Sequence, residues 1–281
     1  MAQFFSFWHG RELCDYEKLC FLSHVAFGDQ FYLFSYNKIL LPPELKNLDA
    51  AEVIPNPLAS HLSRPARFSD LFRFAALTTH PGWIWVDADT LLLKPWEIAQ
   101  GYVFGKEGEK YVPGTLSLPS DSDVLSYLNL QAQAKIGGKS SWGDIGPELF
   151  NNGVKKFNLE AFSQAEETFY PIEFLKIDAL FNPKKFEEVT QKIQFSQSVH
   201  LYNEIQSRIG IEKSLVPQTG SFLYYQFLKY GLLDTNKPQA GKGTTRVLIR
   251  KARTYRVLFI MYKKSAFLKP FLRKIRGKIT K

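Results

Sequence analysis

The stretch from Arg67 to Pro95, RFSDLFRFAALTTHPGWIWVDADTLLLKP, decides the fold of this 281-residue chain. It holds a helical pattern, a turn at Gly82 and an apolar run from Trp83 to Val86. Because the run is apolar at every position, it predicts a strand buried on both faces of a parallel α/β sheet. Open sheets of this kind bind ligands at the carboxyl ends of their strands. Asp87 and Asp89 follow this strand and are therefore candidate site residues.

Asp87 and Asp89 are spaced as a pair of metal ligands would be. Alternate residues of an extended segment point the same way, so both carboxylates can converge on one cation while Ala88 turns away. Carboxylate oxygens suit Mg²⁺ or Mn²⁺ better than Zn²⁺. The alternative interpretation is a solvated acidic turn after a core strand, which is the commoner meaning of an isolated Asp-x-Asp.

The rest of the chain repeats the alternation of strands and helices. Gln3 to Trp8 predicts a first strand, and a helix that Asp15 can cap follows it and stops at Gly28. Strand, helix and strand at this spacing open a parallel α/β sheet. The further elements expected are strands at Phe31 to Ser35, Tyr102 to Gly105 and Ser198 to Tyr202, a helix at Val124 to Ile136, and a turn with a short helix at Trp142 to Phe150.

Asp70 and Arg73 lie on the helix that precedes the Asp87 strand, and the pattern predicts that this helix begins near Ser69. Three residues apart, they share a face. One interpretation is a surface ion pair of little value. We favour a functional pair because the helix leads directly into the strand, with arginine as a rigid donor fork and aspartate as an acceptor.

The composition indicates a globular protein and argues against a disulfide-rich or a membrane-spanning one. A hydrophobic content of 45% supplies a core. Cys14 and Cys20 are too few for a disulfide framework, which predicts a reduced, cytoplasmic compartment. The sequence shows neither the pattern of a signal peptide nor an apolar run long enough to span a membrane.

The net charge of +9 is unevenly distributed. Residues 241–281 hold 14 Lys or Arg and no Asp or Glu, which leaves 22 basic and 27 acidic residues before them, a balance of −5. We therefore predict a domain at 1–240 and a separate basic tail at 241–281. Such a tail points to an anionic partner, either a membrane surface or a nucleic acid.

The tail has the pattern of a basic amphipathic helix that Pro270 ends. This pattern suits an anionic leaflet and predicts a protein peripheral on the inner face of the plasma membrane. In the alternative interpretation the apolar stripe packs on the body and the charges are solvated. The stripe comprises Leu248, Ala252, Tyr255, Phe259, Tyr262 and Ala266, with Arg246, Arg250, Arg253 and Lys264 opposite.

Six short motifs occur together in the body of the chain. They are FWHG at 7–10, SDLFR at 69–73, WVDAD at 85–89, WGDIGPELF at 142–150, FYP at 169–171 and HLYN at 200–203. In this order they resemble the DXD glycosyltransferases of the GT-A fold. The likeness is to the group that contains α-1,4-galactosyltransferases, yeast-type α-1,6-mannosyltransferases and bacterial capsule or lipooligosaccharide enzymes, often called glycosyltransferase family 32. It spans Phe4 to Asn203 and leaves the tail outside.

The resemblance implies an α/β fold with a Rossmann-like, mostly parallel sheet flanked by helices. It also implies a nucleotide sugar across the strand ends and a divalent cation, Mn²⁺ or Mg²⁺. Asp89 would bind the metal, with Asp87 sharing the metal or contacting the donor, and His200 as the third ligand. Asn203 would add an oxygen contact to metal or phosphate. The alternative for His200 is a hydrogen-bonded core residue.

Further site roles follow from the same resemblance. Asp70 and Arg73 would face the sugar, and Trp8 and His9 would line the nucleotide base. Asp144 would complete the sugar pocket. An ordinary core position for Trp8 and a turn-forming role for Asp144 are the alternatives.

The resemblance implies a metal-dependent hexosyltransferase that retains anomeric configuration. It would move a sugar from a nucleotide donor, expected to be a UDP-sugar, to a lipid-linked glycan in cell-surface polysaccharide or lipooligosaccharide synthesis. One alternative is a nucleic-acid-binding protein that uses the basic tail. The other is a GT-A fold that binds a partner without catalysis. Neither alternative is favoured, and no nucleic acid is expected as a partner.

Overall fold

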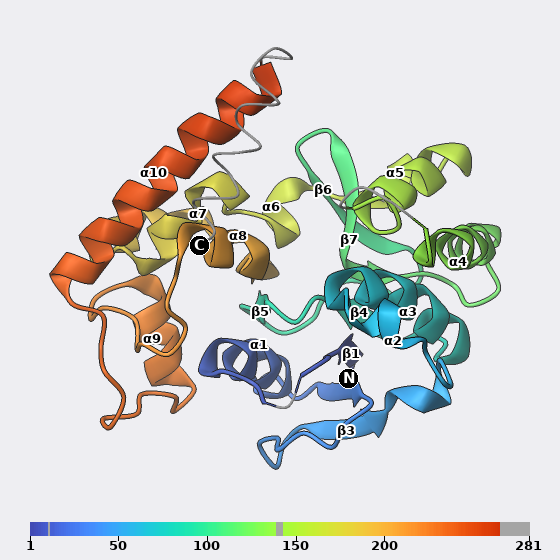
Figure 1. The fold of residues 1–281 in the computed structure, drawn as a ribbon, viewed down its shortest axis with the longest axis horizontal. Coiled ribbons are helices and arrows are strands. Elements are labelled where there is room, and N and C mark those ends of the chain that lie inside the picture. Colours follow the sequence, from blue (N-terminus) through green and yellow to red (C-terminus); the bar gives the residue numbers. More distant parts are fainter. Residues whose placement is uncertain (11, 139–142, 265–281) are drawn as a thin grey trace. The chain divides into compact units, whose positions relative to one another are not determined.

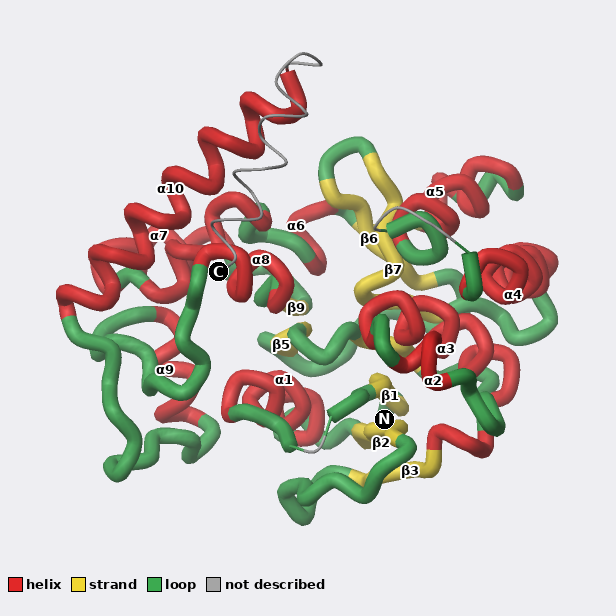
Figure 2. The backbone as a smooth tube through the Cα atoms, viewed as in Figure 1, coloured by secondary structure: helices red, strands yellow, loops and turns green. Residues whose placement is uncertain are grey.

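The computed structural model describes residues 1–10, 12–138 and 143–264 (Figure 1). Its main sheet has seven strands in the order β3-β2-β1-β4-β7-β6-β8, and β5 pairs with β9 separately (Figure 2). The strands are β1 Gln3–Phe7, β2 Gln30–Ser35, β3 Lys46–Asp49, β4 Ile84–Val86, β5 Thr90–Leu92, β6 Val103–Glu107, β7 Lys110–Ser117, β8 Ser163–Gln164 and β9 Ser198–His200.

The helices fall into two compact units of the chain. The first unit is Met1–Pro171 with Phe195–Val199, and the second is Ile172–Gln194 with the described residues from His200 onward. The helices are α1 Asp15–Val25, α2 Ala59–Leu62, α3 Pro65–Thr79, α4 Asp123–Ile136, α5 Pro147–Lys156, α6 Glu166–Phe169, α7 Phe186–Lys192, α8 Asn203–Ile209, α9 Phe222–Lys229 and α10 Lys242–Lys264, with 3-10 turns η1 Ala50–Glu52, η2 Glu160–Phe162, η3 Phe174–Phe181 and η4 Pro183–Lys185.

Most neighbours in the main sheet are parallel. β1 is parallel to β2 and β4, β2 to β3, and β6 to β8, whereas β7 is antiparallel to β4 and β6. The predicted α/β class with a mostly parallel sheet, flanking helices and a C-terminal helix is therefore confirmed. Because β1 and β4 pair with Phe5 opposite Trp85, both strands end at the same edge of the sheet.

The core of the first unit is aromatic and surrounds β4. All three residues of β4 are buried, and Trp85 is 1% exposed. Phe5 packs edge-on against Trp85, with ring centroids 5.4 Å apart. The helix α3 adds Phe68 and Phe72 to the same core. The all-apolar run in the sequence thus indicated a central strand correctly.

Two predicted helix starts were wrong. The helix α3 begins at Pro65, not near Ser69. Proline suits the first helical position because its fixed φ is helical and because the N–H that it lacks would have no partner within the helix there. Asp70 therefore lies in the second turn. The N-cap of α1 is Cys14 rather than Asp15, and the Glu17 carboxylate accepts a hydrogen bond from the Cys14 N–H at 3.1 Å.

Within the second unit, α10 packs on η3 and α8. Ala252 and Tyr255 are buried, and the Phe259 ring meets Phe174 edge-on with centroids 5.1 Å apart. The predicted apolar stripe thus packs inside its own unit, as the alternative interpretation had it. Ala266 and Pro270 lie outside the described residues. The predicted domain boundary at 240/241 falls within this unit and stays a prediction.

None of the described helices combines the length and apolar character that crossing a membrane requires.

Candidate active site

The turn after β4 places Asp87 at the edge where β1 and β4 both end. The Asp87 N–H donates to the Gly114 carbonyl of β7 at 2.7 Å, and the Thr90 N–H donates back to the Asp87 carbonyl at 3.0 Å. This tight turn joins β4 to β5 and carries Asp89 between them. Backbone hydrogen bonds on both sides therefore fix the position of the acidic pair.

One oxygen of the Asp87 carboxylate is held by side chains of the first unit. The Trp85 indole N–H donates to Oδ1 at 2.8 Å, and an Arg73 guanidinium nitrogen lies 3.1 Å from the same oxygen. The Arg73 guanidinium also stacks over the Trp85 ring, 4.9 Å from its centroid. The orientation of this carboxylate is thus set before any ligand binds.

Arg73 links two carboxylates to the sheet. Its guanidinium lies 2.8 Å from Asp70 Oδ1 and donates to the Pro113 carbonyl of β7 at 2.6 Å. The Arg73 side chain is 5% exposed. Such burial excludes the interpretation as a solvated surface pair, because a buried guanidinium must be matched by acceptors.

Neighbouring groups shift the pKa of the Asp70 carboxyl in opposite directions. Burial raises the pKa of Asp70 to about 6, with Asp87 and Asp144 acting in the same direction, while Arg73 and Arg67 lower it. A carboxyl with this pKa can accept a hydrogen bond from a sugar hydroxyl when ionised or donate one when protonated. Asp70 is therefore suited to hold a polar ligand beside Asp87.

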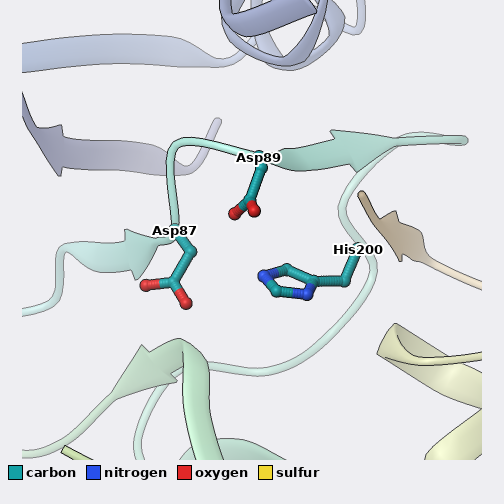
Figure 3. A group of neighbouring side chains, drawn as sticks. All are labelled: Asp87, Asp89 and His200. Atoms are coloured by element: carbon teal, nitrogen blue, oxygen red, sulfur yellow. The ribbon is translucent and has the colours of Figure 1, made fainter. Parts of the chain in front are cut away.

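Asp87, Asp89 and His200 form a possible metal site (Figure 3). Each offers one ligand atom, and these atoms lie within 4.8 Å of one another. His200 ends β9, which pairs with β5, and the Leu93 N–H donates to the Gln197 carbonyl at 3.0 Å just before this strand. Two carboxylates and one imidazole fit a divalent metal ion.

Trp8 and His9 follow β1 at the same sheet edge. The Trp8 backbone N–H donates to Phe34 O at 2.9 Å, and His9 is exposed. The Trp8 indole N–H is buried and has no hydrogen-bond partner within the described part of the chain. Such a donor is available to a ligand. The roles given to Trp8 and His9 in base binding stay predictions.

Asp144 lies in the loop before α5. Its carboxylate is 3.6 Å from Arg67, whose guanidinium also donates to the Gly138 carbonyl at 3.0 Å. A Cβ atom added at Gly146 would collide with the Asp70 carboxylate, so the loop lies directly against Asp70. Trp142, from the same motif, lies outside the described residues. The sugar-pocket role of Asp144 stays a prediction.

Asn203 begins α8 and accepts a hydrogen bond from Lys213 Nζ at 2.7 Å. The preceding Tyr202 has φ 51°, an unusual left-handed conformation for a side chain of this size. Its ring meets the His200 ring edge-on, with centroids 4.3 Å apart. The predicted contact of Asn203 with metal or phosphate stays a prediction.

Two residues near Asp87 received no role from the sequence. Trp85 is one. It stands two residues before Asp87 on an extended segment, and this spacing already indicates that the two side chains share a face. Tyr170 of the FYP motif is the other. A Cβ on Gly114 would lie 2.7 Å from the Tyr170 hydroxyl and 3.1 Å from Asp87 Oδ2. Burial raises the pKa of Tyr170, so its phenol stays neutral and can donate.

Comparison with known proteins gives one family match. Residues 138–216 match the model described as the alpha 1,4-glycosyltransferase conserved region, a range that contains Asp144, His200 and Asn203. No curated protein sequence matches the chain. The solved structure titled "PaToxG Glycosyltransferase" is 10% identical, with a TM-score of 0.45 over 91% of this chain and 86% of that chain. The family match and the Asp87–Asp89 pair support a glycosyltransferase.

Proposed function

We propose that this glycosyltransferase uses a divalent cation, held by Asp87, Asp89 and His200, to transfer a sugar from a nucleotide donor to a glycan. The observation that carries the proposal is the convergence of two carboxylates and an imidazole at the edge where β1 and β4 end. Supporting it, the alpha 1,4-glycosyltransferase match includes His200. The donor is proposed to be a UDP-sugar and the metal Mn²⁺.

When bound, the cation would offset the charge of the donor diphosphate and so stabilise the departing nucleotide. The residues of this chain orient the donor. Arg73 and Trp85 keep the Asp87 carboxylate in one position, and Asp70 presents an acceptor for sugar hydroxyls. The buried Trp8 indole N–H is a free donor, among the described residues, for a group of the nucleotide.

The stereochemistry and acceptor are part of the same proposal. Transfer would retain anomeric configuration, and the acceptor would be a lipid-linked glycan of a cell-surface polysaccharide or lipooligosaccharide. The enzyme would act at the inner face of the plasma membrane. Proton NMR of the anomeric signal of the first product distinguishes retention from inversion.

Thermal-shift measurements with nucleotide sugars test the central claim. A ligand that binds only the folded state at 100 times its Kd adds about 2.7 kcal/mol. For a domain of this size, that corresponds to a rise in Tm of roughly 5–10 °C. We expect such a rise with a UDP-sugar and Mn²⁺ together, and Asp87→Asn and Asp89→Asn should each abolish its metal-dependent part.

The chain contains its own control. Asp121 and Asp123 repeat the Asp-x-Asp spacing in the first unit, and both are exposed. The double variant Asp121→Asn, Asp123→Asn removes the same charge and should leave the metal-dependent shift unchanged. If Asp87→Asn and Asp89→Asn kept the full shift, the proposed metal site would be refuted.

A further inference from the structure

The helix α10 has a second apolar face that its packing does not use. Val257 is 56% exposed, Ile260 41% and Met261 42%. The opposite face, with Ala252 and Tyr255, is buried within the second unit. Folding therefore accounts for one apolar face and leaves the other in water. Ile260 and Met261 lie three and four residues after Val257, so the three are neighbours on the helix surface, and a contiguous exposed apolar patch marks an interaction site.

Exposed arginines share this outward face. Arg246, Arg250 and Arg253 are all exposed, and Arg250 stands seven residues before Val257, two turns of the helix. The burial pattern assigns Val257, Ile260, Met261, Arg246, Arg250 and Arg253 to this outward face of α10.

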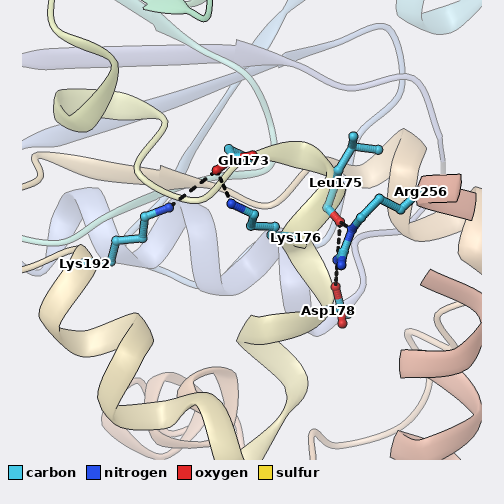
Figure 4. Close-up of polar contacts among 6 residues, drawn as sticks. All are labelled: Glu173, Leu175, Lys176, Asp178, Lys192 and Arg256. Atoms are coloured by element: carbon cyan, nitrogen blue, oxygen red, sulfur yellow. Dashed lines mark hydrogen bonds and ion pairs between the residues drawn. The ribbon is translucent and has the colours of Figure 1, made fainter. Parts of the chain in front are cut away.

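Arg246 and Arg250 differ from Arg256 on the same helix, because within the described residues only Arg256 of the three forms an ion pair with a carboxylate. Arg256 donates to the Leu175 carbonyl at 2.9 Å and lies 3.1 Å from the Asp178 carboxylate (Figure 4). In the portion of the chain that the structure describes, no ion pair joins Arg246 or Arg250 to a carboxylate. The sequence from 241 to 281 supplies no Asp or Glu at all. The outward face therefore keeps a net positive charge.

We infer that the outward face of α10 docks on an anionic lipid surface. Val257, Ile260 and Met261 enter the boundary between headgroups and acyl chains, and the arginines contact lipid phosphates. Guanidinium groups pair with phosphate through parallel hydrogen bonds. A nucleic acid would use the same arginines, but it would gain little from the three apolar side chains, which favours the bilayer. The inference does not depend on the proposed transferase activity.

This assignment moves the membrane-binding face to the opposite side of the helix from the one that the sequence pattern predicted. The predicted stripe includes Tyr255 and Phe259, which pack within the second unit. An apolar stripe committed to packing cannot also enter a bilayer while the unit stays folded. The two faces thus make separate predictions for mutagenesis.

Flotation of the full chain with vesicles tests the inference. Vesicles of phosphatidylcholine alone are compared with vesicles of three parts phosphatidylcholine and one part phosphatidylglycerol. One variant, Arg246→Gln with Arg250→Gln, removes two charges, and its matched control, Lys38→Gln with Lys184→Gln, removes two exposed charges elsewhere. A second variant, Ile260→Ser with Met261→Ser, is matched by Leu130→Ser with Leu228→Ser, which are 65% and 55% exposed in the wild type.

We expect binding to the anionic vesicles only. The arginine variant should bind roughly 30-fold more weakly, at about fivefold per charge near an anionic surface. The serine variant should lose roughly tenfold through lost apolar burial. Both controls should stay within about twofold of wild type. Circular dichroism spectra identical to wild type establish that each variant is folded.

Two results would overturn the inference. The first is vesicle binding that neither α10 variant weakens. The second is a protein that ignores anionic vesicles but binds single-stranded RNA, with affinity lost in the arginine variant and kept in the serine variant. That second outcome would assign the outward face to nucleic acid.

Discussion

The charged groups around Asp87 and those on the outward face of α10 are arranged in opposite ways. In the first unit, one buried guanidinium, Arg73, is shared by the carboxylates of Asp70 and Asp87. On α10, Arg246 and Arg250 are exposed, and the described residues offer them no carboxylate. Matched and buried charges hold a geometry, whereas unmatched and exposed charges are available to a partner from outside.

Because the two kinds of arginine differ in burial and in pairing, replacing them should affect different properties of the protein. A buried, shared cation should matter mainly for the folded state and for the position of the carboxylates. An exposed, unmatched cation should matter for binding and hardly for stability. The following substitutions are chosen to break this contrast if it is wrong.

Arg73→Met should have the largest effect on stability. It leaves two carboxylates close together without their cation, which should lower the free energy of unfolding by about 3–5 kcal/mol. Urea denaturation measures the loss. Arg246→Met, the same change on the outward face, should stay within about 0.5 kcal/mol of wild type. Similar losses for both variants would contradict the contrast.

His24 is a buried basic group beside which the described residues place no carboxylate, so it gives a third case for the comparison. Burial lowers the pKa of His24 to about 4, partly offset by the hydrogen bond to the Cys20 carbonyl. The unfolded state takes up this proton below an ordinary pKa near 6.5, but the folded state does so only near 4. The free energy of unfolding should therefore fall as the pH is lowered through this window, by on the order of 2–3 kcal/mol.

The variant His24→Phe should remove that part of the pH dependence, because phenylalanine cannot take up the proton and the site is lined by the rings of Phe4 and Phe31. Urea denaturation at a series of pH values gives the slope. An unchanged slope in the variant would show that His24 takes up its proton at the same pH in the folded and the unfolded state.

Arg256 and Arg250 repeat the comparison within one helix. Arg256→Gln loses the pair with Asp178 and hydrogen bonds to Leu175, and should cost about 1–2 kcal/mol of stability. Arg250→Gln should cost less than about 0.5 kcal/mol and yet weaken binding to anionic vesicles about fivefold. Equal effects of the two variants in both assays would remove the distinction.

The sequence predicted the parts of the fold that depend on local patterns. The apolar run before Asp87 indicated β4, and the alternation near the N-terminus indicated β1, α1 and β2. The antiparallel insertion of β7 between β4 and β6 was not foreseen, because strand order depends on pairings between distant segments. The start of α3 was misplaced because Ser69 was preferred as a cap over proline at the first turn.

The site was predictable where motif order carried information. The expected return of His200 to the Asp87–Asp89 turn agrees with the group of three ligand atoms. The hydrogen bond from Trp85 to Asp87 was not predicted, although the two residues are two apart in the sequence. The residues of the apolar strand were interpreted only as core residues. The approach of Tyr170 to Gly114 depends on tertiary packing and left no local signal.

The hydrogen bond from the Trp85 indole to Asp87 also allows the site to be followed by tryptophan fluorescence. An indole whose N–H faces a carboxylate emits at an energy that depends on the charge of that carboxylate. The other tryptophans, at 8, 83, 96 and 142, can be replaced by phenylalanine to leave Trp85 as the single fluorophore. The emission of such a protein would then report ligand binding at the Asp87 carboxylate, with no added label and no need to measure catalytic activity.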